Sequence, residues 1–490
     1  MATCSCSIVL RLSSSETAYD WDAALTALFA LRRAGRAVPI VALVGWPVFA
    51  VAQQAASAPD AGADASGTTT SQPEQIVPEN WAIHGQATFT PAFQPGFRSS
   101  FTGPQSLPAD ANGRETLDAT LYAGVRPWEG GEIWINPEMD QGFGLGNSFG
   151  VAGYLSGEAY KLGETDPYYR MSRAFFRQTI DLGGEVQKVD PDLNQLGGGQ
   201  TANRIVVTVG KIAVTDIFDN NKYAHDPRND FLNWSVVDAG TFDYAADAWG
   251  VTYGASAEWY QGRYALRVGL FDMSDVPNGL HLDLPLFQEM QFVTEAEESH
   301  TLFDQPGKLR FLYWLTRANM GTYSDALALA LATGTTPSTA AVRNYRSKYG
   351  VVLNLEQQVV PDVGFFSRLG WTQQGVEEYD FTDISQTIQL GFSFGGARWG
   401  RSNDSVGVAA VANQISRSAK EYLAAGGLGG IIGDGQLPEA GPEQLIETYY
   451  RWGVLDWAQV TTDYQFVNNP GYNRQRGPVS VLTARMHVQF

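Results

Sequence analysis

The chain has 490 residues, a formal net charge of −19 at pH 7 and two cysteines, Cys4 and Cys6. An acidic chain without a basic cluster on any predicted face lacks the positive surface that nucleic-acid binding needs, so nucleic acid is excluded as a partner. Because both cysteines lie in the first ten residues, loss of the N-terminus leaves neither a disulfide-stapled domain nor a cysteine metal site. Glycine (52) and the aromatics (13 Trp, 21 Tyr, 25 Phe) are abundant, which favours turn-rich β-structure.

Residues 1–52 are predicted to be a signal sequence for export. Three arginines precede a short apolar core at 37–49, and a small-x-small cleavage site follows at 50–52. A membrane anchor needs about 20 uninterrupted apolar residues, whereas two prolines interrupt this run. Residues 1–30 do not resemble part of a signal, which suggests a mis-assigned start upstream of the true one. The Ala-, Ser-, Thr- and Pro-rich residues 53–80 are expected to form a flexible periplasmic tail.

From Trp81 to the last residue, apolar and polar residues alternate with the period of two that is typical of β-strands. In the segment TLDATLYAGVRPWEGGEIWI, apolar side chains from Leu117 to Val125 share one face, a tight turn follows at 127–131, and the alternation resumes at Ile133. The pattern predicts sixteen strands, at 81–93, 115–125, 131–137, 171–182, 204–213, 249–260, 263–272, 286–297, 308–316, 347–359, 363–373, 383–395, 404–413, 445–455, 459–467 and 478–490.

The predicted connections differ in length according to their place. Most connections after even-numbered strands are short, with 183–203 as the chief exception, and those after odd-numbered strands are mostly long, including 138–170, 214–248, 317–346 and 414–444. An even number of strands with short turns at one end and long loops at the other is the signature of an outer-membrane barrel. The sequence therefore predicts an all-β fold for residues 81–490, a transmembrane antiparallel β-barrel of 16 strands with short periplasmic turns and long extracellular loops.

The two faces of the predicted strands support a barrel in the bacterial outer membrane. A soluble β-sandwich also alternates, but it buries its apolar face between two sheets. Here the polar faces repeatedly carry arginine and carboxylate, which a water-filled lumen accommodates while lipid covers the apolar outside. Two short helices are expected inside long connections, SDALALALATG with Ser324 as its cap and SAKEYLAAGG.

No catalytic or cofactor-binding constellation is found, so we expect no enzyme activity and no cofactor. The five histidines are scattered, and there is neither a GxSxG elbow nor a P-loop. An outer-membrane hydrolase would need a Ser/His pair, and His487 has no evident serine partner. GFGLGNSFG lacks the strand–turn–helix context of a nucleotide site. DIFDNNKYAHDPRND lacks the Gly and terminal Glu of an EF-hand, so a loop folded against the pore wall is favoured over a calcium site.

Projecting the polar faces inward gives the candidate pore-lining residues. Arginines beside carboxylates set up a transverse field in a channel and offer donors and acceptors at fixed angles. The alternative for any single arginine is that it only balances an internal acid and holds the barrel in shape. The basic candidates are Arg173, Arg177, Arg267, Arg310, Arg368, Arg451 and Arg485; the acidic ones are Asp118, Asp181, Glu258, Glu356, Glu447 and Asp463; Trp314 lies on the same face, and Trp234, Tyr244 and Trp249 border the longest loop.

Four segments carry a resemblance to a known family. They are GKIAVTDIFDNNKYAHDPRNDFLNW, AFFRQTIDLGGE, RSKYGVVLNLEQQVVPDVGFFSRLGW and NNPGYNRQRGPVSVLTARMHVQF. From about Trp81 to Phe490 the chain resembles the carbohydrate-selective porins of the OprB type. The resemblance implies passive, selective diffusion of sugars, glucose in the best-known members, into the periplasm. Such porins narrow their pore with inward-folded loops and basic wall residues, which makes Arg173 and Arg177 the first candidates for solute contact and 211–234 a pore loop.

The expected partners follow from this resemblance. They are carbohydrates, outer-membrane lipid and the barrel-assembly machinery, which is implied to recognise the C-terminal strand through its last residue, Phe490; that residue also falls where an interfacial aromatic girdle is expected. The protein is expected to be a monomer or a homotrimer. Two other functions remain open at this point. Arginines that draw anions would make a general or anion-favouring diffusion porin, and a structural or adhesive barrel would conduct nothing.

Overall fold

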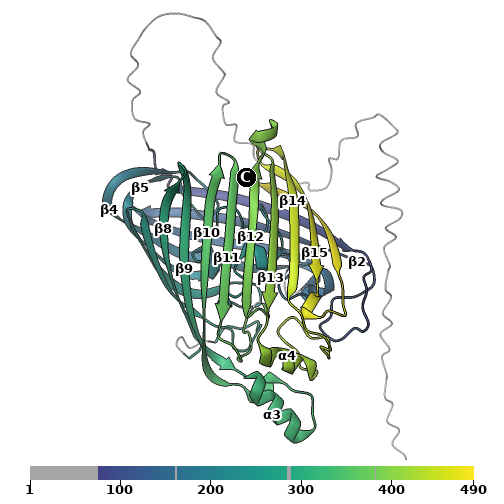
Figure 1. The fold of residues 1–490 in the computed structure, drawn as a ribbon. Coiled ribbons are helices and arrows are strands. Elements are labelled where there is room, and N and C mark those ends of the chain that lie inside the picture. Colours follow the sequence, from purple (N-terminus) through teal and green to yellow (C-terminus); the bar gives the residue numbers. More distant parts are fainter. Residues whose placement is uncertain (1–75, 160–162, 284–287, 381) are drawn as a thin grey trace, which may run out of the picture. The chain divides into compact units, whose positions relative to one another are not determined.

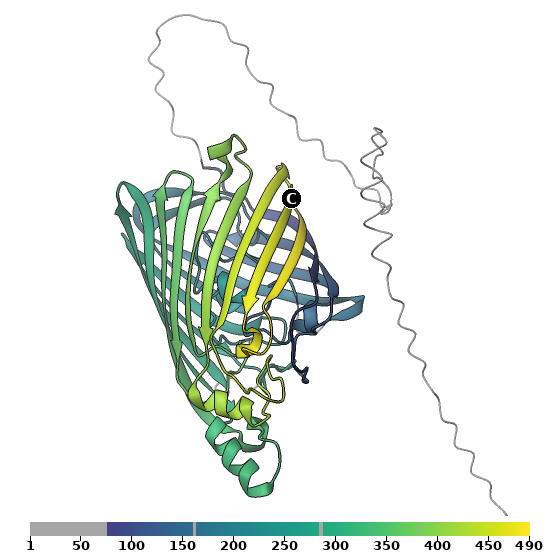
Figure 2. The same ribbon diagram turned by 45° about the vertical axis from the view of Figure 1, so that its right-hand side comes forward.

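The computed structural model describes residues 76–159, 163–283, 288–380 and 382–490. The predicted signal sequence (1–52) and most of the predicted tail (53–80) lie outside the described residues. The described chain forms one sheet of sixteen antiparallel strands, each paired with its neighbours in the sequence. The first and last strands pair with each other and close the barrel. Figures 1 and 2 show this closure, with the yellow final strands beside the purple first ones.

The strands have the following bounds: β1 Trp81–Gln94, β2 Asn112–Trp128, β3 Gly131–Gly142, β4 Glu164–Val189, β5 Gly198–Ile212, β6 Thr252–Gln261, β7 Tyr264–Asp272, β8 Met290–Leu302, β9 Gln305–Met320, β10 Asn344–Val360, β11 Val363–Thr372, β12 Gln386–Gly395, β13 Ser405–Gln414, β14 Glu443–Leu455, β15 Ala458–Asn468 and β16 Val479–Gln489. All sixteen predicted strands are therefore confirmed. Their ends differ most at β4, which begins seven residues before and ends seven residues after its predicted bounds.

The two faces of each strand meet different surroundings. In β16, Leu482 and Met486 are 54% and 50% exposed on the outside, whereas Arg485 and His487 are 1% and 3% exposed on the inside. A membrane-spanning strand must place apolar side chains toward lipid, because an unpaired polar group there costs several kcal/mol. The inward direction predicted for the polar faces is thus confirmed for this strand.

The connections are short at one end of the barrel and long at the other. The turns 129–130, 262–263, 303–304, 361–362 and 456–457 join strands at the end where β1 begins and β16 finishes. The 183–203 connection is shorter than predicted, at 190–197, because both flanking strands continue past their predicted ends. Figure 1 shows α3 (Tyr323–Thr333) and α4 (Arg417–Ala424) at the opposite end, among the long loops.

The predicted helices are present, with one correction to their caps. The cap of α3 is Thr322 and not Ser324, since the Thr322 hydroxyl accepts a bond of 3.1 Å from the backbone N–H of Asp325. The helix ends at Gly334, whose φ of 71° suits a residue without a Cβ. The α4 helix begins after Ser416, which caps it in the same way. No helix in the described part of the chain is long and apolar enough to cross a membrane.

Two long loop segments, 143–159 and 213–251, fold into the barrel. Leu232, Val236 and Ala245 of the second loop are all 0% exposed. The loops support each other, because the N–H of Gly157 donates to the carbonyl of Leu232 (2.7 Å) and the N–H of Trp234 donates to the carbonyl of Tyr154 (2.9 Å). The inside of this barrel is therefore largely filled by its own chain, and the space left to a solute depends on how these loops sit.

Candidate pore and solute cavity

The loop 213–251, called the pore loop from here on, is fastened to the wall by a buried arginine of β11. Arg368 has 0% exposure, and its guanidinium donates to the Asp219 carboxylate at 2.9 Å. It also donates to the backbone carbonyls of Asp219, Ala224, Val236 and Val237 at 2.9–3.2 Å. A charge without water needs such partners, because an unpaired buried charge is very costly. One wall side chain thus fixes two separate stretches of the pore loop.

Other wall strands fasten the pore loop in the same manner. The Glu447 carboxylate of β14 accepts from the backbone N–H groups of Leu232 (2.5 Å) and Asn233 (3.2 Å). Arg485 of β16 donates to the Asp230 carbonyl at 3.1 Å. Buried backbone N–H groups need such acceptors, because an unpaired one is costly. The pore loop is held on several sides, which makes it a rigid obstacle inside the lumen.

A cavity of about 1660 Å³ lies between the pore loop and the short-turn end of the barrel. Its wall comes from β2 to β10, and the pore loop contributes Asp216, Asn220, Lys222 and His225. Its described lining holds seven Lys or Arg side chains and eight Asp or Glu side chains: Arg126, Arg177, Arg204, Lys222, Arg267, Lys308 and Arg310 against Glu129, Glu132, Asp181, Asp192, Asp216, Glu258, Glu297 and Glu356. The lining is therefore nearly neutral overall.

One wall of the cavity carries a ladder of alternating charges across β6 to β10. Arg267 of β7 donates to Glu258 of β6 at 3.1 Å. On its other side it donates to the two β8 carboxylates, Glu295 at 2.8 Å and Glu297 at 3.1 Å. Because antiparallel neighbours place opposite residues on the same face, alternating signs on successive strands bring the pairs into contact. Each arginine of this wall is thereby surrounded by acids.

The ladder continues to the pore loop. Arg310 of β9 donates to Glu297 at 2.8 Å and to Glu356 of β10 at 3.0 Å. The Nζ of Lys308 lies 3.0 Å from Glu297, and the Lys308 side chain is 39% exposed. Glu356 also accepts from the backbone N–H of Lys222 at 2.8 Å. The charged wall and the pore loop therefore form one hydrogen-bonded unit, with Lys308 exposed to the cavity.

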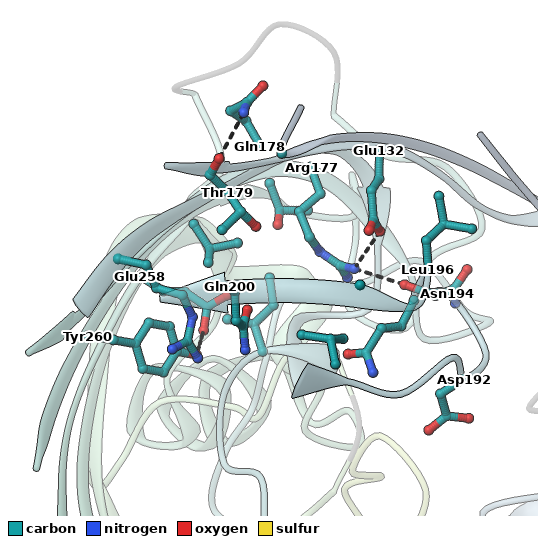
Figure 3. Close-up of a pocket in the computed structure, with 18 of the residues that line it drawn as sticks. Glu132, Arg177, Gln178, Thr179, Asp192, Asn194, Leu196, Gln200, Glu258 and Tyr260 are labelled. Carbon is teal, nitrogen blue, oxygen red and sulfur yellow. Dashed lines mark hydrogen bonds and ion pairs between the residues drawn. The ribbon is translucent and has the colours of Figure 1, made fainter. Parts of the chain in front are cut away.

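The opposite wall of the cavity is built by β2, β3 and β4. Figure 3 shows Arg177 pointing toward Glu132 and toward the turn that carries Asn194. Its Nη1 lies 3.4 Å from the Glu132 carboxylate and donates to the Asn194 carbonyl at 2.8 Å. Glu132 is also held by Arg126 at 3.1 Å and by the indole N–H of Trp134 at 3.0 Å. Arg177 keeps 28% of its side chain exposed, so it faces the cavity with donors to spare.

Aromatic surface is present on the first wall, beside Glu258. The Tyr260 hydroxyl donates to the Glu258 carboxylate at 2.5 Å, and the Arg204 guanidinium lies 4.0 Å from the centre of the Tyr260 ring. Figure 3 shows Tyr260 and Glu258 across the cavity from Arg177. The cavity thus presents a carboxylate, an aromatic ring and guanidinium groups around one water-accessible space.

Arg173, four residues before Arg177, is occupied by the pore loop. Its Nε and Nη2 donate to the two oxygens of Asp216 at 2.7 and 2.6 Å. Burial alone would raise the pKa of Asp216, but Arg173 and the N–H of Ala213 stabilise the carboxylate and lower the pKa below its ordinary value. Asp216 therefore stays ionised at neutral pH and holds Arg173 against the loop.

Within the described ranges, no group of three or more His, Cys, Asp or Glu side chains is placed to hold a metal ion.

The chain has recognisable relatives among known proteins. The family described as carbohydrate-selective porin, OprB family, matches residues 105–490. This chain belongs to that family. It is accordingly a carbohydrate-selective porin of the bacterial outer membrane, and its family and fold are those of channel proteins. No curated protein matches the chain.

A solved structure agrees with the fold of this porin. The high-pH structure of Pseudomonas putida OprB matches with a TM-score of 0.63 at 16% sequence identity, and the match covers 84% of this chain and 94% of that one. At this identity the likeness shows the fold alone. The outer membrane channel DcaP of Acinetobacter baumannii matches with a TM-score of 0.47 at 8% identity, covering 84% of this chain and 97% of that one.

The structure divides the porin's predicted pore-lining residues into two groups. Six line the cavity together: Arg177, Asp181, Glu258, Arg267, Arg310 and Glu356. The others do not line it. Arg173, Arg368, Glu447 and Arg485 bind the pore loop, as given above, and Arg451 lies in β14 opposite Ser405 and Thr461. Trp314 is 0% exposed; it packs over Gly350, where a Cβ would lie 2.6 Å from its ring, so it belongs to the packed interior.

Several charged residues of the porin's lumen are absent from the predicted set. Glu295 and Glu297 lie on the inner face of β8, and the alternation Phe292, Thr294, Ala296 against Val293, Glu295, Glu297 was a signal that could have found them. Arg170, which pairs with Glu138 and with Asp140 (2.5 Å), was hidden by a bulge. Asn136 pairs with Arg173 but Pro137 pairs with Met171, so an extra residue lets Arg170 and Arg173 both point inward.

Proposed function

We propose that this porin lets neutral, glucose-like sugars diffuse passively through the cavity into the periplasm. The observation that carries the proposal is the balance of charge around the cavity, where guanidinium and carboxylate groups alternate along one wall. A sugar is a neutral polyol, so its hydroxyl groups can bond to both kinds of group without meeting a net charge. Tyr260 adds aromatic surface to the same cavity, beside the Arg204 guanidinium.

The same balance argues against an anion-favouring pore. A positive lumen attracts anions because fields from unpaired charges add up in a confined space. Here Arg267 has carboxylates of Glu258, Glu295 and Glu297 within 3.1 Å, so its field is largely cancelled at short range. Lys308 and Arg177 are partly exposed, but they too lie beside carboxylates. We therefore favour sugar selectivity over general diffusion or anion preference.

The short-turn end, which holds the C-terminus, is proposed to face the periplasm, and the long loops are proposed to face outward. Transport then follows the sugar gradient and needs neither an energy source nor a catalysed step. The contacts must be weak enough for release, since a solute that binds tightly stops the flow. We further propose assembly through the C-terminal strand and a monomer or homotrimer in the membrane, which chemical cross-linking of intact outer membranes would distinguish.

Liposome swelling tests this function directly. Vesicles that contain the porin are placed in isotonic glucose, in a disaccharide and in organic anions of similar size, and the swelling rates are compared with those of empty vesicles. We expect glucose to enter faster than an anion of equal size. Permeation rates that depend on solute size alone would contradict sugar selectivity. If no solute entered the vesicles, the porin function itself would be contradicted.

A further inference from the structure

One connection at the short-turn end differs from its neighbours because it folds into the barrel. Five of the connections at this end have two residues and 396–404 has nine, whereas 190–197, called the exit turn from here on, has eight. Leu196 of the exit turn is 0% exposed and belongs to the interior apolar cluster that contains Trp134 and Phe175. Leu193 packs against the same cluster. Apolar anchors of this kind give the turn one fixed position inside the lumen.

The exit turn is held by the segment Ile76–Asn80, called the strap from here on. The backbone N–H of Glu79 donates to the Gly197 carbonyl at 3.0 Å. In return, the N–H of Gly197 donates to the Glu79 carboxylate at 2.7 Å. The sequence predicts a flexible tail up to residue 80, but these bonds tie the end of that segment to the barrel. One backbone bond and one bond to a side chain therefore hold the strap and the exit turn together.

Arg126 of β2 joins the strap and the exit turn to the cavity wall. Its Nη1 donates to the carbonyls of Glu79 (2.7 Å) and Gly197 (3.0 Å). Its Nη2 donates to the Glu132 carboxylate (3.1 Å) and to the Leu196 carbonyl (3.3 Å). A planar guanidinium can donate hydrogen bonds to several fixed acceptors at once, which a flexible lysine does not do. Arg126 thus sets the position of the strap, the turn and the carboxylate that faces Arg177.

The exit turn forms part of the solute cavity. Asp192, Asn194 and Leu196 line it, as do Ile76 and Asn80 of the strap. Figure 3 shows Asn194 and Leu196 beside Arg177. Because the Asn194 carbonyl accepts the 2.8 Å bond from Arg177, the position of the turn also sets the direction of that guanidinium.

We propose that the exit turn, positioned by Glu79 and Arg126, is a second narrow point of the pore that limits the size of the sugar that leaves the cavity. The inference rests on the proposed function for the nature of the solute and for the direction of transport. It assigns Glu79 and Arg126 as positioning residues, since they act on the opening through the turn. The pore loop and the exit turn then bound the cavity from two sides.

Two variants test this inference in the full-length porin. In the first, Asn-Gly replaces residues 191–196 and closes the hairpin with a two-residue turn, which the pairing of Val189 with Gly198 allows. In the second, Glu79→Ala removes the side-chain acceptor of the strap. Glu185→Ala is the matched control, because Glu185 is an exposed carboxylate of the same hairpin that does not line the cavity. Correct folding is checked by the altered gel mobility of an unheated barrel.

The readouts are single-channel conductance in salt and the ratio of disaccharide to glucose flux in liposomes. We expect the shortened turn to raise conductance by about twofold, since a wider opening admits more ions. Glu79→Ala should shift conductance in the same direction by less, and both variants should raise the disaccharide-to-glucose ratio. Conductance and flux ratio equal to those of the Glu185→Ala control in both variants would overturn the inference. Salt conductance reports the width of the opening whether or not the pore prefers sugars, so the two proposals can fail separately. The proposed function fails only if the unaltered porin shows no preference for sugar.

Discussion

Replacing Arg368 by methionine is the strongest single test of how the pore loop is held. The substitution keeps most of the side chain's length but removes five hydrogen bonds that reach Asp219, Ala224, Val236 and Val237. Removing one partner of a buried ion pair generally costs about 3–5 kcal/mol, because the other charge is left without compensation.

The expected cost lies at the lower end of that range. Asp219 keeps two other donors after the substitution, the side-chain amide of Asn354 at 2.7 Å and the backbone N–H of Ala239 at 2.6 Å. Its carboxylate therefore remains partly satisfied, and we expect a loss of about 3 kcal/mol in the free energy of unfolding. Arg368→Met combined with Asp219→Asn should recover part of this loss, since the buried negative charge is removed as well.

The assay is denaturant unfolding of the folded porin in vesicles, followed by tryptophan fluorescence. Arg417→Met on α4 is the control, because Arg417 is 93% exposed and its pair with Glu421 should contribute little. Single-channel recordings should show a noisier current for Arg368→Met as the pore loop loosens. A free energy of unfolding within about 0.5 kcal/mol of the unaltered protein would refute the anchoring role, since that range is typical of ordinary surface changes.

Three further predictions concern the cavity and assembly. Glu297→Gln removes a carboxylate shared by three cations, so organic-anion flux should rise about tenfold relative to glucose at low salt; an unchanged flux ratio and an unchanged reversal potential would contradict the charge-balance argument. Arg177→Ala should alter glucose flux in liposomes more than Arg173→Ala, since only Arg177 lines the cavity; equal effects, or none, would place the solute path elsewhere. Deletion of Phe490, whose backbone exchanges two hydrogen bonds of 2.9 and 3.0 Å with Gly85, should lower the fraction of folded barrel in the outer membrane, whereas Phe490→Tyr should not; equal folded fractions would argue against a role of the last residue in assembly.

The strands were predictable because the membrane imposes one simple rule on every one of them. Lipid requires Leu482 and Met486 to point outward, and the pleat then turns Arg485 and His487 inward. The ends of β4 were less predictable for a local reason. Beyond Asp181 the register shifts twice, around Gly183 and before Val186, so the alternation is broken although the pairing with β5 continues.

The alternation did not predict which inward residues line the cavity and which bind the pore loop. Arg267 and Arg368 both alternate with apolar neighbours, yet one faces the cavity and the other lies under the pore loop. The difference depends on where Asp219 comes to lie after a long, irregular loop has folded back, and no strand periodicity encodes that position. The role of Arg126 was not predictable for a similar reason, since its acceptors at Glu79 and Gly197 are distant in the sequence.

The dependence of glucose flux on glucose concentration tests the central claim most directly. If sugars bind transiently to the guanidinium, carboxylate and aromatic groups of the cavity, the flux through the unaltered porin in liposomes should level off at high glucose concentration, since a site that is already occupied admits no second sugar. We predict such saturation, and we predict that a second neutral sugar slows the entry of glucose. A flux that rises in strict proportion to concentration, with no competition between sugars, would contradict the account and would leave a simple water-filled pore.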